Sequence, residues 1–250
     1  TTSTSNARRR YIRFLNILKT DLIKATSKGD KDENIPNQDY IKFFEDDNLL
    51  VVTISDGLGS SKNSLEGAQE ACKIVISEIK KIEEIEEINF LSETILYKWE
   101  KSIESKLGNA KDYRTTNSFI AVMKNSNKII IGQLGDVFVS IRIDGLFRYL
   151  GSNEKDFINE TSCLGSGRYE NYKMAIFDFS HSFDFLIASD GIGDELLEDK
   201  NEMLHNYFIN KYKNIPAPKR NKVLKKEIAE FLNEKNNDDK SLVFVWTNMK

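Results

Sequence analysis

Short apolar runs joined by polar turns make up most of the chain. Six of these runs stand in pairs around a few polar residues: 40–44 with 49–54, 117–123 with 128–134, and 137–143 with 146–150. Asp144-Gly145, in the last pair, has the residue types of a tight two-residue β-turn. Because tight turns join antiparallel neighbours, the pattern predicts three β-hairpins.

Four other stretches carry apolar residues at helical spacing: 65–79, 91–107, about 194–212 and 219–234. Single strand-like runs complete the pattern: 21–26, 172–177, 183–189 and 242–247. Several of these strands are apolar on both faces, and such strands need cover on both sides. We therefore predict an α+β fold, a four-layer α-β-β-α sandwich of two antiparallel sheets flanked by helices.

The first residues differ in character from the rest. Residues 1–20 are predicted to form a polar tail and a short basic helix that opens at Arg8-Arg9-Arg10, and residues 21–250 a single domain. Packing of this helix on the domain is the simpler interpretation, and a helix that binds a partner or a lipid surface is the alternative.

Charge and composition exclude several classes of function. The net charge is −3, which gives no general attraction to nucleic acid or to an anionic membrane. No run reaches the ~18 apolar residues of a membrane span, and the first residues lack the apolar core of a signal peptide. Cys72 and Cys163 stand at no metal or disulfide spacing, and Cys72 is expected to be a small buried side chain. We predict a cytoplasmic protein.

Four aspartates lie at the ends of strand-like runs or beside a glycine: Asp39, Asp56, Asp190 and Asp238. Taken singly, each has an ordinary explanation as a turn, cap or solvated loop residue. Taken together they indicate more, because carboxylates at the ends of neighbouring strands converge in space. Converging carboxylates with few basic neighbours are typical ligands of hard divalent cations.

The residue types favour Mg²⁺ or Mn²⁺ over zinc. His181 and His205 have no partner at ligand spacing, and both are expected at the surface. Two Mg²⁺ or Mn²⁺ ions ~4 Å apart can share a carboxylate and activate a water for attack on a phosphoryl group. The chain has no G-x-x-x-x-G-K-[ST] loop, which argues against an NTPase.

Five motifs occur in an order that resembles a known family: Asn37-Gln38-Asp39, Asp56-Gly57, Gly135-Asp136, Ser189-Asp190-Gly191 and Asp238-Asp239-Lys240-Ser241. Over residues 21–247 the chain resembles the protein phosphatase 2C family, the metal-dependent Ser/Thr phosphatases, and it looks most like the bacterial branch. Thr115-Thr116 is similar to the family's Gly-Thr-Thr stretch, with Arg114 where glycine is usual.

The resemblance implies a role for each aspartate. Asp56 would bridge two metal ions, and the carbonyl oxygen of Gly57 would bind the second. Asp190 and Asp238 would complete the shell of the first ion, while Asp39 would hold the water shell of the second. Asp39 and Asp56 are therefore the expected catalytic residues, with two Mg²⁺ or Mn²⁺ ions as cofactors.

A third, weaker metal site is implied at Asp136, joined by Asp194. The alternatives stay open: Asp136 as a turn residue between strands, and Asp194 as a charge at the start of a helix.

Besides Arg114, two positions depart from the family pattern. Asn34 stands where many members carry an arginine that grips the substrate phosphate. Lys28 or Lys31 could replace that arginine, but solvated loop lysines are the simpler interpretation. Leu58 stands where some members have a histidine near the leaving group, so water would protonate the leaving oxygen. No substrate-binding residue is assigned.

These observations lead to a first hypothesis, a Mg²⁺- or Mn²⁺-dependent protein serine/threonine phosphatase in which a metal-bound water attacks phosphorus. Its partners would be a phosphorylated Ser/Thr protein and an opposing Ser/Thr kinase. The alternative is a catalytically weak or inactive module of the same fold that binds a phosphoprotein or signalling partner. A weaker third hypothesis is a hydrolase of small phosphorylated metabolites or nucleotides.

Overall fold

The computed structural model describes residues 18–106, 108–148, 162–166, 172–196, 198–232 and 236–248. Most of the predicted tail and basic helix at residues 1–20 lies outside these residues. Within the described part, no helix combines the length and apolar character needed to cross a lipid bilayer.

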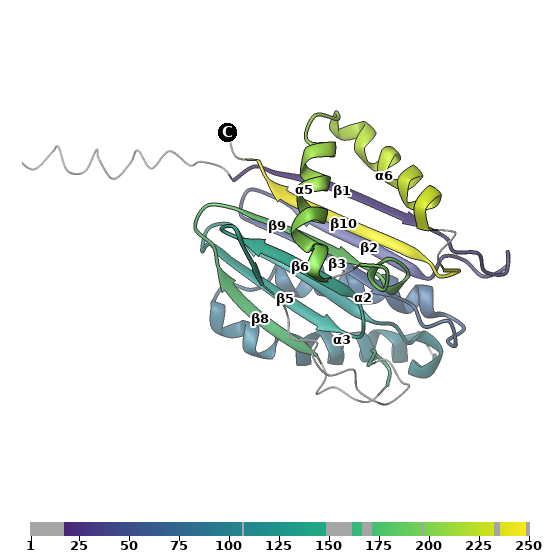
Figure 1. Ribbon diagram of the computed structural model, residues 1–250. Helices are drawn as coiled ribbons and strands as arrows, with labels where there is room; N and C mark the ends of the chain where they lie inside the picture. Colours follow the sequence, from purple (N-terminus) through teal and green to yellow (C-terminus); the bar gives the residue numbers. More distant parts are fainter. Residues whose placement is uncertain are drawn as a thin grey trace, which may run out of the picture.

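Two five-stranded antiparallel sheets form the centre of the molecule (Figure 1). The β10 sheet contains, in spatial order, β1 (Thr20–Ser27), β10 (Lys240–Thr247), β9 (Phe183–Ala188), β6 (Phe138–Ile143) and β7 (Leu146–Arg148). The β3 sheet contains β2 (Asp39–Glu45), β3 (Leu49–Asp56), β4 (Asn117–Met123), β5 (Lys128–Leu134) and β8 (Lys173–Asp178).

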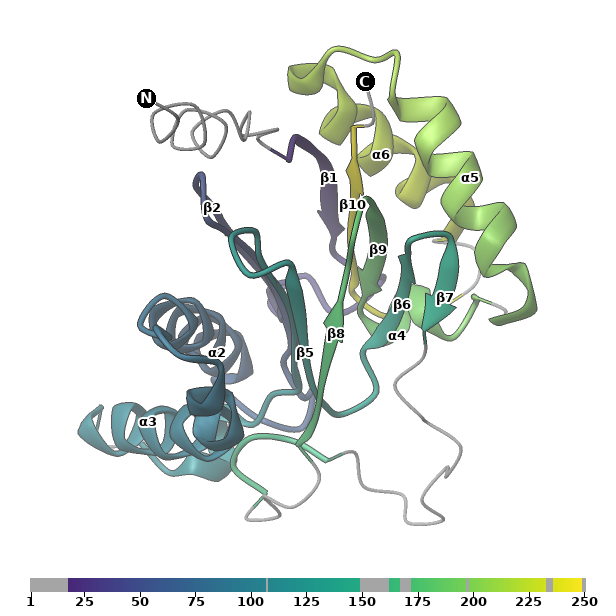
Figure 2. The same cartoon turned by 90° about the vertical axis from the view of Figure 1, so that its left-hand side faces the viewer.

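Helices cover the outer face of each sheet and complete the four predicted layers (Figure 2). On the β3 sheet lie α2 (Ser64–Ile79) and α3 (Leu91–Ser105), and on the β10 sheet lie α5 (Asn201–Tyr212) and α6 (Ala217–Leu232). The short helical segments are η1 (Ile85–Phe90), η2 (Ala110–Tyr113), α4 (Asp190–Gly193) and η4 (Glu198–Lys200). The α+β sandwich is confirmed.

The core explains why several strands are apolar at every position. In β3, Val51 packs toward α2 and α3, whereas its neighbour Val52 packs between the two sheets. In β10, Phe244 packs toward α5 and α6, and Val245 packs between the sheets. Successive side chains of a strand point to opposite faces, so covering both faces buries every residue.

The three predicted hairpins are present as β2–β3, β4–β5 and β6–β7. In the turn between β6 and β7, Asp144 and Gly145 have φ of 48° and 85°. Two consecutive positive φ values are the signature of the tight turn that the residue types predicted, and glycine adopts such a value at no steric cost.

The predicted helix at about 194–212 begins later than expected. Bonds from the Glu195 N–H to the Ile192 carbonyl and from the Leu196 N–H to the Gly193 carbonyl span three residues, so this segment forms tight turns. The regular helix α5 starts at Asn201. Helix α6 begins at Ala217, two residues before its predicted start at 219.

His181 is exposed as predicted, but the prediction of a surface position for His205 is wrong. His205 is completely buried between α5 and the β10 sheet. Its Nδ1 lies 2.5 Å from Asp184 Oδ1 and its Nε2 3.0 Å from Ser140 Oγ. Arg142 Nε donates to the second Asp184 oxygen at 2.9 Å. Burial is tolerated because both ring nitrogens have partners.

Ser140, His205 and Asp184 contact one another in the order of a nucleophilic Ser-His-Asp triad. Ser140 and His205 are, however, both 0% exposed. No substrate can reach them, so the row holds α5 against β6 and β9. Cys72 is buried as predicted, although among the Thr53 and Ser55 hydroxyls, and burial raises the pKa of its thiol to about 11.

Replacing His205 with leucine should lower the free energy of unfolding by about 2–4 kcal/mol, because Asp184 Oδ1 and the buried Ser140 hydroxyl would lose the ring nitrogens that they contact. Urea denaturation followed by circular dichroism measures the change. His181→Leu is the matched control, since this exposed histidine should contribute less than about 0.5 kcal/mol. Equal effects of the two substitutions would contradict the buried role.

Candidate metal centre

Asp39 and Asp56 lie opposite each other in the β3 sheet. Asp39 is the first residue of β2, Asp56 the last residue of β3, and their Cα atoms are register partners. The backbone of Asp56 is fixed by the next strand, because the Thr116 N–H and the Thr115 hydroxyl both donate to its carbonyl at 2.8 Å. The next residue, Gly57, is buried, and its N–H donates to the Gln38 carbonyl at 3.2 Å.

The β10 sheet brings the other two predicted ligands to the same end of the sandwich. Asp190 is the first residue of α4, separated from the end of β9 by Ser189, and Asp238 stands two residues before β10. The two strand ends are joined by the Ser189 N–H, which donates to the Ser241 carbonyl at 2.9 Å. The Ser189 hydroxyl then donates to Asp39 Oδ2 at 2.7 Å, and this bond connects the two sheets inside the site.

Gly191 permits close packing between α4 and the start of β10. A side chain here would place its Cβ 2.1 Å from the Asp239 carbonyl oxygen, a distance that no real contact allows. The Asn236 side-chain amide donates to the Gly191 carbonyl at 3.0 Å, and this bond also holds α4 against the segment before β10. The glycine therefore sets how near Asp190 and Asp238 can come.

A buried lysine shapes the turn that carries Asp238. Lys240 is completely buried, and its ammonium donates to the Asp238 carbonyl at 2.7 Å and to the carbonyl and side chain of Asn236 at 2.9 and 3.0 Å. Burial lowers the pKa of Lys240. Three acceptors on one ammonium hold the turn closed, so Asp238 presents its side chain from a fixed backbone.

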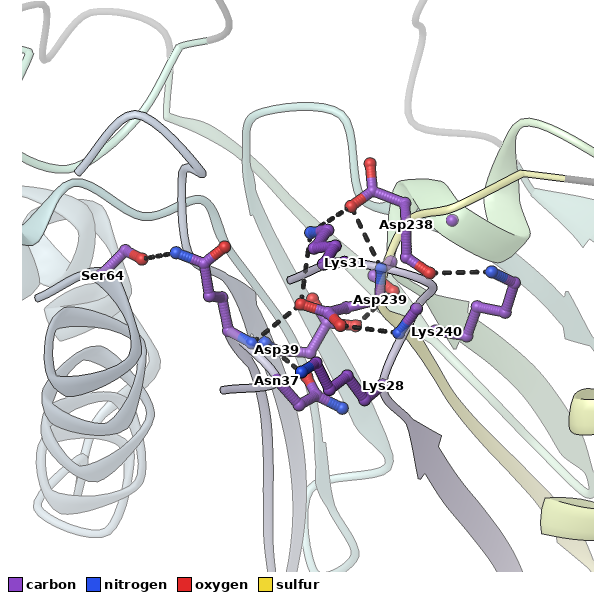
Figure 3. A network of polar contacts seen from close by, with 12 residues as sticks. Lys28, Lys31, Asn37, Asp39, Ser64, Asp238, Asp239 and Lys240 are labelled. Atoms are coloured by element: carbon purple, nitrogen blue, oxygen red, sulfur yellow. Dashed lines mark hydrogen bonds and ion pairs between the residues drawn. The ribbon is translucent and has the colours of Figure 1, made fainter. Parts of the chain in front are cut away.

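Asp239 fastens the segment that precedes β2, a role that the sequence did not reveal. Its Oδ1 accepts the Gly29 N–H and its Oδ2 the Gln38 N–H, both at 2.9 Å. The carboxylate is nearly fully buried. The segment 29–38 is thus attached to the start of β10 at both ends, and it delivers Asp39 to the site (Figure 3).

Lys31 is not the solvated lysine that the sequence predicted. Its Nζ lies 2.5 Å from Asp238 Oδ1 and 3.3 Å from Asp239 Oδ2 (Figure 3). Burial alone would lower the pKa of Lys31, but the hydrogen bonds and charges of the two aspartates outweigh it and raise that pKa. No sequence signal connects these residues, because they meet only in space.

Asn34 and Lys28, the other two residues considered for phosphate binding, have their contacts away from the carboxylate cluster. Asn34 is exposed, and its side chain donates to Asp32 Oδ1 at 3.0 Å. Lys28 donates to the carbonyls of Asp32 and Glu33 at 2.9 and 3.2 Å.

Asp39 is buried, Asp56 and Asp190 are partly buried beside it, and burial together with this closeness raises the pKa values of all three. Burial, with the nearby charges of Asp239 and Asp190, raises the pKa of Asp39 to about 7. Burial and the charges of Asp39 and Asp190 raise the pKa of Asp56 well above its usual value. The pKa of Asp190 is raised by burial and by the charges of Asp238 and Asp136. Like charges are thus held together at one point.

The donor set fits a hard divalent cation. One oxygen of Asp39, Oδ1, is buried without a hydrogen-bond partner, which is costly unless something positive binds it. The other carboxylates turn to protein donors, Asp190 to the Gly191 N–H at 2.6 Å and Asp238 to Lys31. Accordingly, no three His, Cys, Asp or Glu side chains of the described residues already stand as a formed coordination shell.

The two residues implied in a third site lie at the rim. Asp136 is exposed between β5 and β6, and its charge acts on Asp190. Asp194 ends α4 and is also exposed. It lines a pocket of ≈ 290 Å³ together with Lys31, Asp190, Gly191, Asn236, Asn237 and Asp238. The predicted residues therefore share one region, with Asp136 and Asp194 outside its buried part.

Comparison with known families identifies the fold. The family model of protein phosphatase 2C matches residues 28–233, most of the chain. The chain belongs to the protein phosphatase 2C family. This family is metal-dependent, in agreement with the carboxylate-rich site. No curated protein matched the chain in a sequence search.

Solved structures of protein phosphatase 2C relatives share the fold at low sequence identity. The S. agalactiae serine/threonine phosphatase has a TM-score of 0.67 and 16% identity, covering 92% of this chain and 100% of its own. The catalytic domain of the serine/threonine phosphatase PstP, in complex with two manganese ions, has a TM-score of 0.59 and 13% identity. The match covers 92% of this chain and 99% of the PstP chain. RsbX in complex with magnesium has a TM-score of 0.61 and 14% identity, and the match covers 92% of this chain and 96% of the RsbX chain.

Asp239→Asn should lower the free energy of unfolding of this phosphatase 2C chain by about 2–4 kcal/mol. An amide has one acceptor oxygen, so either the Gly29 or the Gln38 N–H would face an NH₂ group. Denaturant unfolding in EDTA measures the effect without metal. Asn237→Ala, on the same turn but exposed, is the control and should change stability by less than about 0.5 kcal/mol. A variant as stable as the wild type would contradict the anchoring role of Asp239.

Proposed function

We propose that this chain is a Mg²⁺- or Mn²⁺-dependent protein serine/threonine phosphatase. The observation that carries the proposal is the convergence of Asp39, Asp56, Asp190 and Asp238 at one end of two sheets, with a buried Asp39 oxygen left without a partner. A fold that accepts this electrostatic cost in its interior is suited to hold positive charge there.

In this proposal Asp56 would be the central ligand, since the charges of Asp39, its register partner, and of Asp190 both act on its carboxylate. Asp190 and Asp238 would hold one ion, and Asp39 and the Gly57 carbonyl would hold the other. When bound, the ions supply positive charge that polarises a water molecule and stabilises the phosphoryl oxygens. Leu58 offers no proton, so the leaving oxygen takes its proton from solvent.

The family supports phosphoproteins as the substrate class. Phosphoserine and phosphothreonine are monoesters whose uncatalysed hydrolysis is among the slowest known reactions, which explains the use of divalent cations. The proposal includes an opposing Ser/Thr kinase as the source of the substrate. The segment 29–38 and the exposed rim around Asp194 border the site where a phosphorylated side chain would enter.

Asp56→Asn and Asp190→Asn should each abolish Mn²⁺-dependent phosphate release from phosphopeptides while the fold is kept. Each change also removes a buried like charge, so the metal-free variant should unfold with a free energy about 0.5–2 kcal/mol higher than the wild type. A malachite-green assay measures activity, and denaturation in EDTA measures stability.

Asp47→Asn, which removes the same charge in an exposed turn, is the matched control and should leave both quantities unchanged. Wild-type turnover in either Asp56→Asn or Asp190→Asn would eliminate the proposed mechanism.

We assign a weaker third ion to Asp136 and Asp194. The double change to asparagine should remove only the weakest binding event in a calorimetric Mn²⁺ titration, because both carboxylates are exposed at the rim. The two tighter events should persist. Loss of a tight event, or a titration identical to that of the wild type, would contradict this assignment.

A second candidate is a phosphatase-fold module with weak or no activity that binds a phosphoprotein. It is favoured by Asn34, which stands in the place of a phosphate-gripping arginine and turns to Asp32. Hydrolysis of an aryl phosphate and of phosphopeptides, with and without Mn²⁺, separates the two candidates, since only the enzyme releases phosphate.

A further inference from the structure

We propose that the Lys31 ammonium is a built-in competitor of divalent cations at Asp238. The inference rests on the proposed metal site and adds a control on its occupancy. Lys31 Nζ is 2.5 Å from Asp238 Oδ1, the side chain that the proposed first ion requires. The ammonium also reaches the pocket that Asp190, Gly191 and Asp194 line.

The position of Lys31 follows from how its segment is attached. Asp239 accepts the N–H of Gly29 on one side of Lys31 and the N–H of Gln38 on the other. These two bonds hold the segment 29–38 against the start of β10, so the lysine is delivered to the site by the backbone. The second contact of the Lys31 ammonium, 3.3 Å to Asp239 Oδ2, holds it beside Asp238 (Figure 3).

Competition follows from the chemistry of this contact. A carboxylate oxygen that already accepts an ammonium must release or share it before it can bind a divalent ion. An ammonium that remains within a few ångströms also repels the incoming cation. If the site is competent only when Lys31 has moved away, the apparent dissociation constant equals the intrinsic one divided by the fraction of time that Lys31 is away.

The surroundings set the size of the effect. The Asp238 side chain is 45% exposed and that of Lys31 23% exposed, so water screens the pair in part. Such pairs have moderate strength, and we expect about a two- to tenfold effect on metal affinity. If the lysine served only to order the carboxylates, its removal would change metal affinity in the opposite direction, because metal binding would become weaker.

Isothermal titration calorimetry with MnCl₂ on the full chain tests whether Lys31 weakens or strengthens Mn²⁺ binding. Lys31→Met should lower the dissociation constant of one Mn²⁺ by about two- to tenfold. Lys31→Arg keeps the charge and should stay closer to the wild type than Lys31→Met. Lys28→Met is the matched control, because it removes the same charge just before the segment 29–38 but breaks bonds only to backbone carbonyls.

Thermal denaturation gives a second readout that does not involve activity. In EDTA, Lys31→Met should melt below the wild type, since Asp238 and Asp239 lose their counter-ion. Saturating Mn²⁺ should then raise its melting temperature by more than it raises that of the wild type. If Lys28→Met shifts affinity as much as Lys31→Met, a general charge effect explains the data and the inference fails.

Unchanged or weaker Mn²⁺ binding by Lys31→Met overturns the competition, whatever the enzyme does with phosphopeptides. Binding by Lys31→Met but not by the wild type would support it even if neither protein released phosphate, and the proposed function would then fail alone. Absence of Mn²⁺ binding in both proteins would overturn both proposals.

Discussion

Mutual repulsion of buried carboxylates is the constraint around which this structure is organised. Asp39 and Asp56 approach from one sheet and Asp190 from the other, in a place where burial already penalises charge. Left to themselves, such groups would separate. They stay together because regular structure fixes the backbone on every side, through antiparallel register in one sheet and the Ser189–Ser241 bond in the other.

The two sheets therefore serve as a rigid frame for an unfavourable cluster. The apolar side chains packed between them supply the stability that the cluster lacks, and α2, α3, α5 and α6 bury the outer faces. The hydrogen bond from the Ser189 hydroxyl to Asp39 links the two sheets within the carboxylate cluster. The protein thus combines a tightly packed interior with one end at higher electrostatic energy.

Much of the fold was predictable because it depends on local patterns. The hairpins follow from turn residues such as Asp144-Gly145, and the four layers follow from strands that are apolar on both faces. The four aspartates were predictable for the same reason, since strand ends converge. The burial of His205 was not, because it depends on Asp184 and Ser140 from distant strands.

The contacts that hold the carboxylate-bearing segments in place could not be predicted from the sequence either. Lys31 and Asp239 are far apart in the chain, and neither has a local pattern that indicates a partner. Their roles arise from the three-dimensional path of the segment 29–38, which no hydrophobic period describes. Sequence patterns thus predicted which groups assemble at the site, while the contacts that hold them in place required the structure.

The double attachment of the segment 29–38 to Asp239 has an evolutionary consequence. Because both ends are fastened to one side chain, the residues between them can change without moving the start of β2. The entropic cost of a longer loop grows slowly, by only about 0.6 kcal/mol for each doubling of its length. Insertions here could therefore reshape the surface beside the site while its carboxylates keep their places, and related proteins could diverge in what they recognise before they diverge in chemistry.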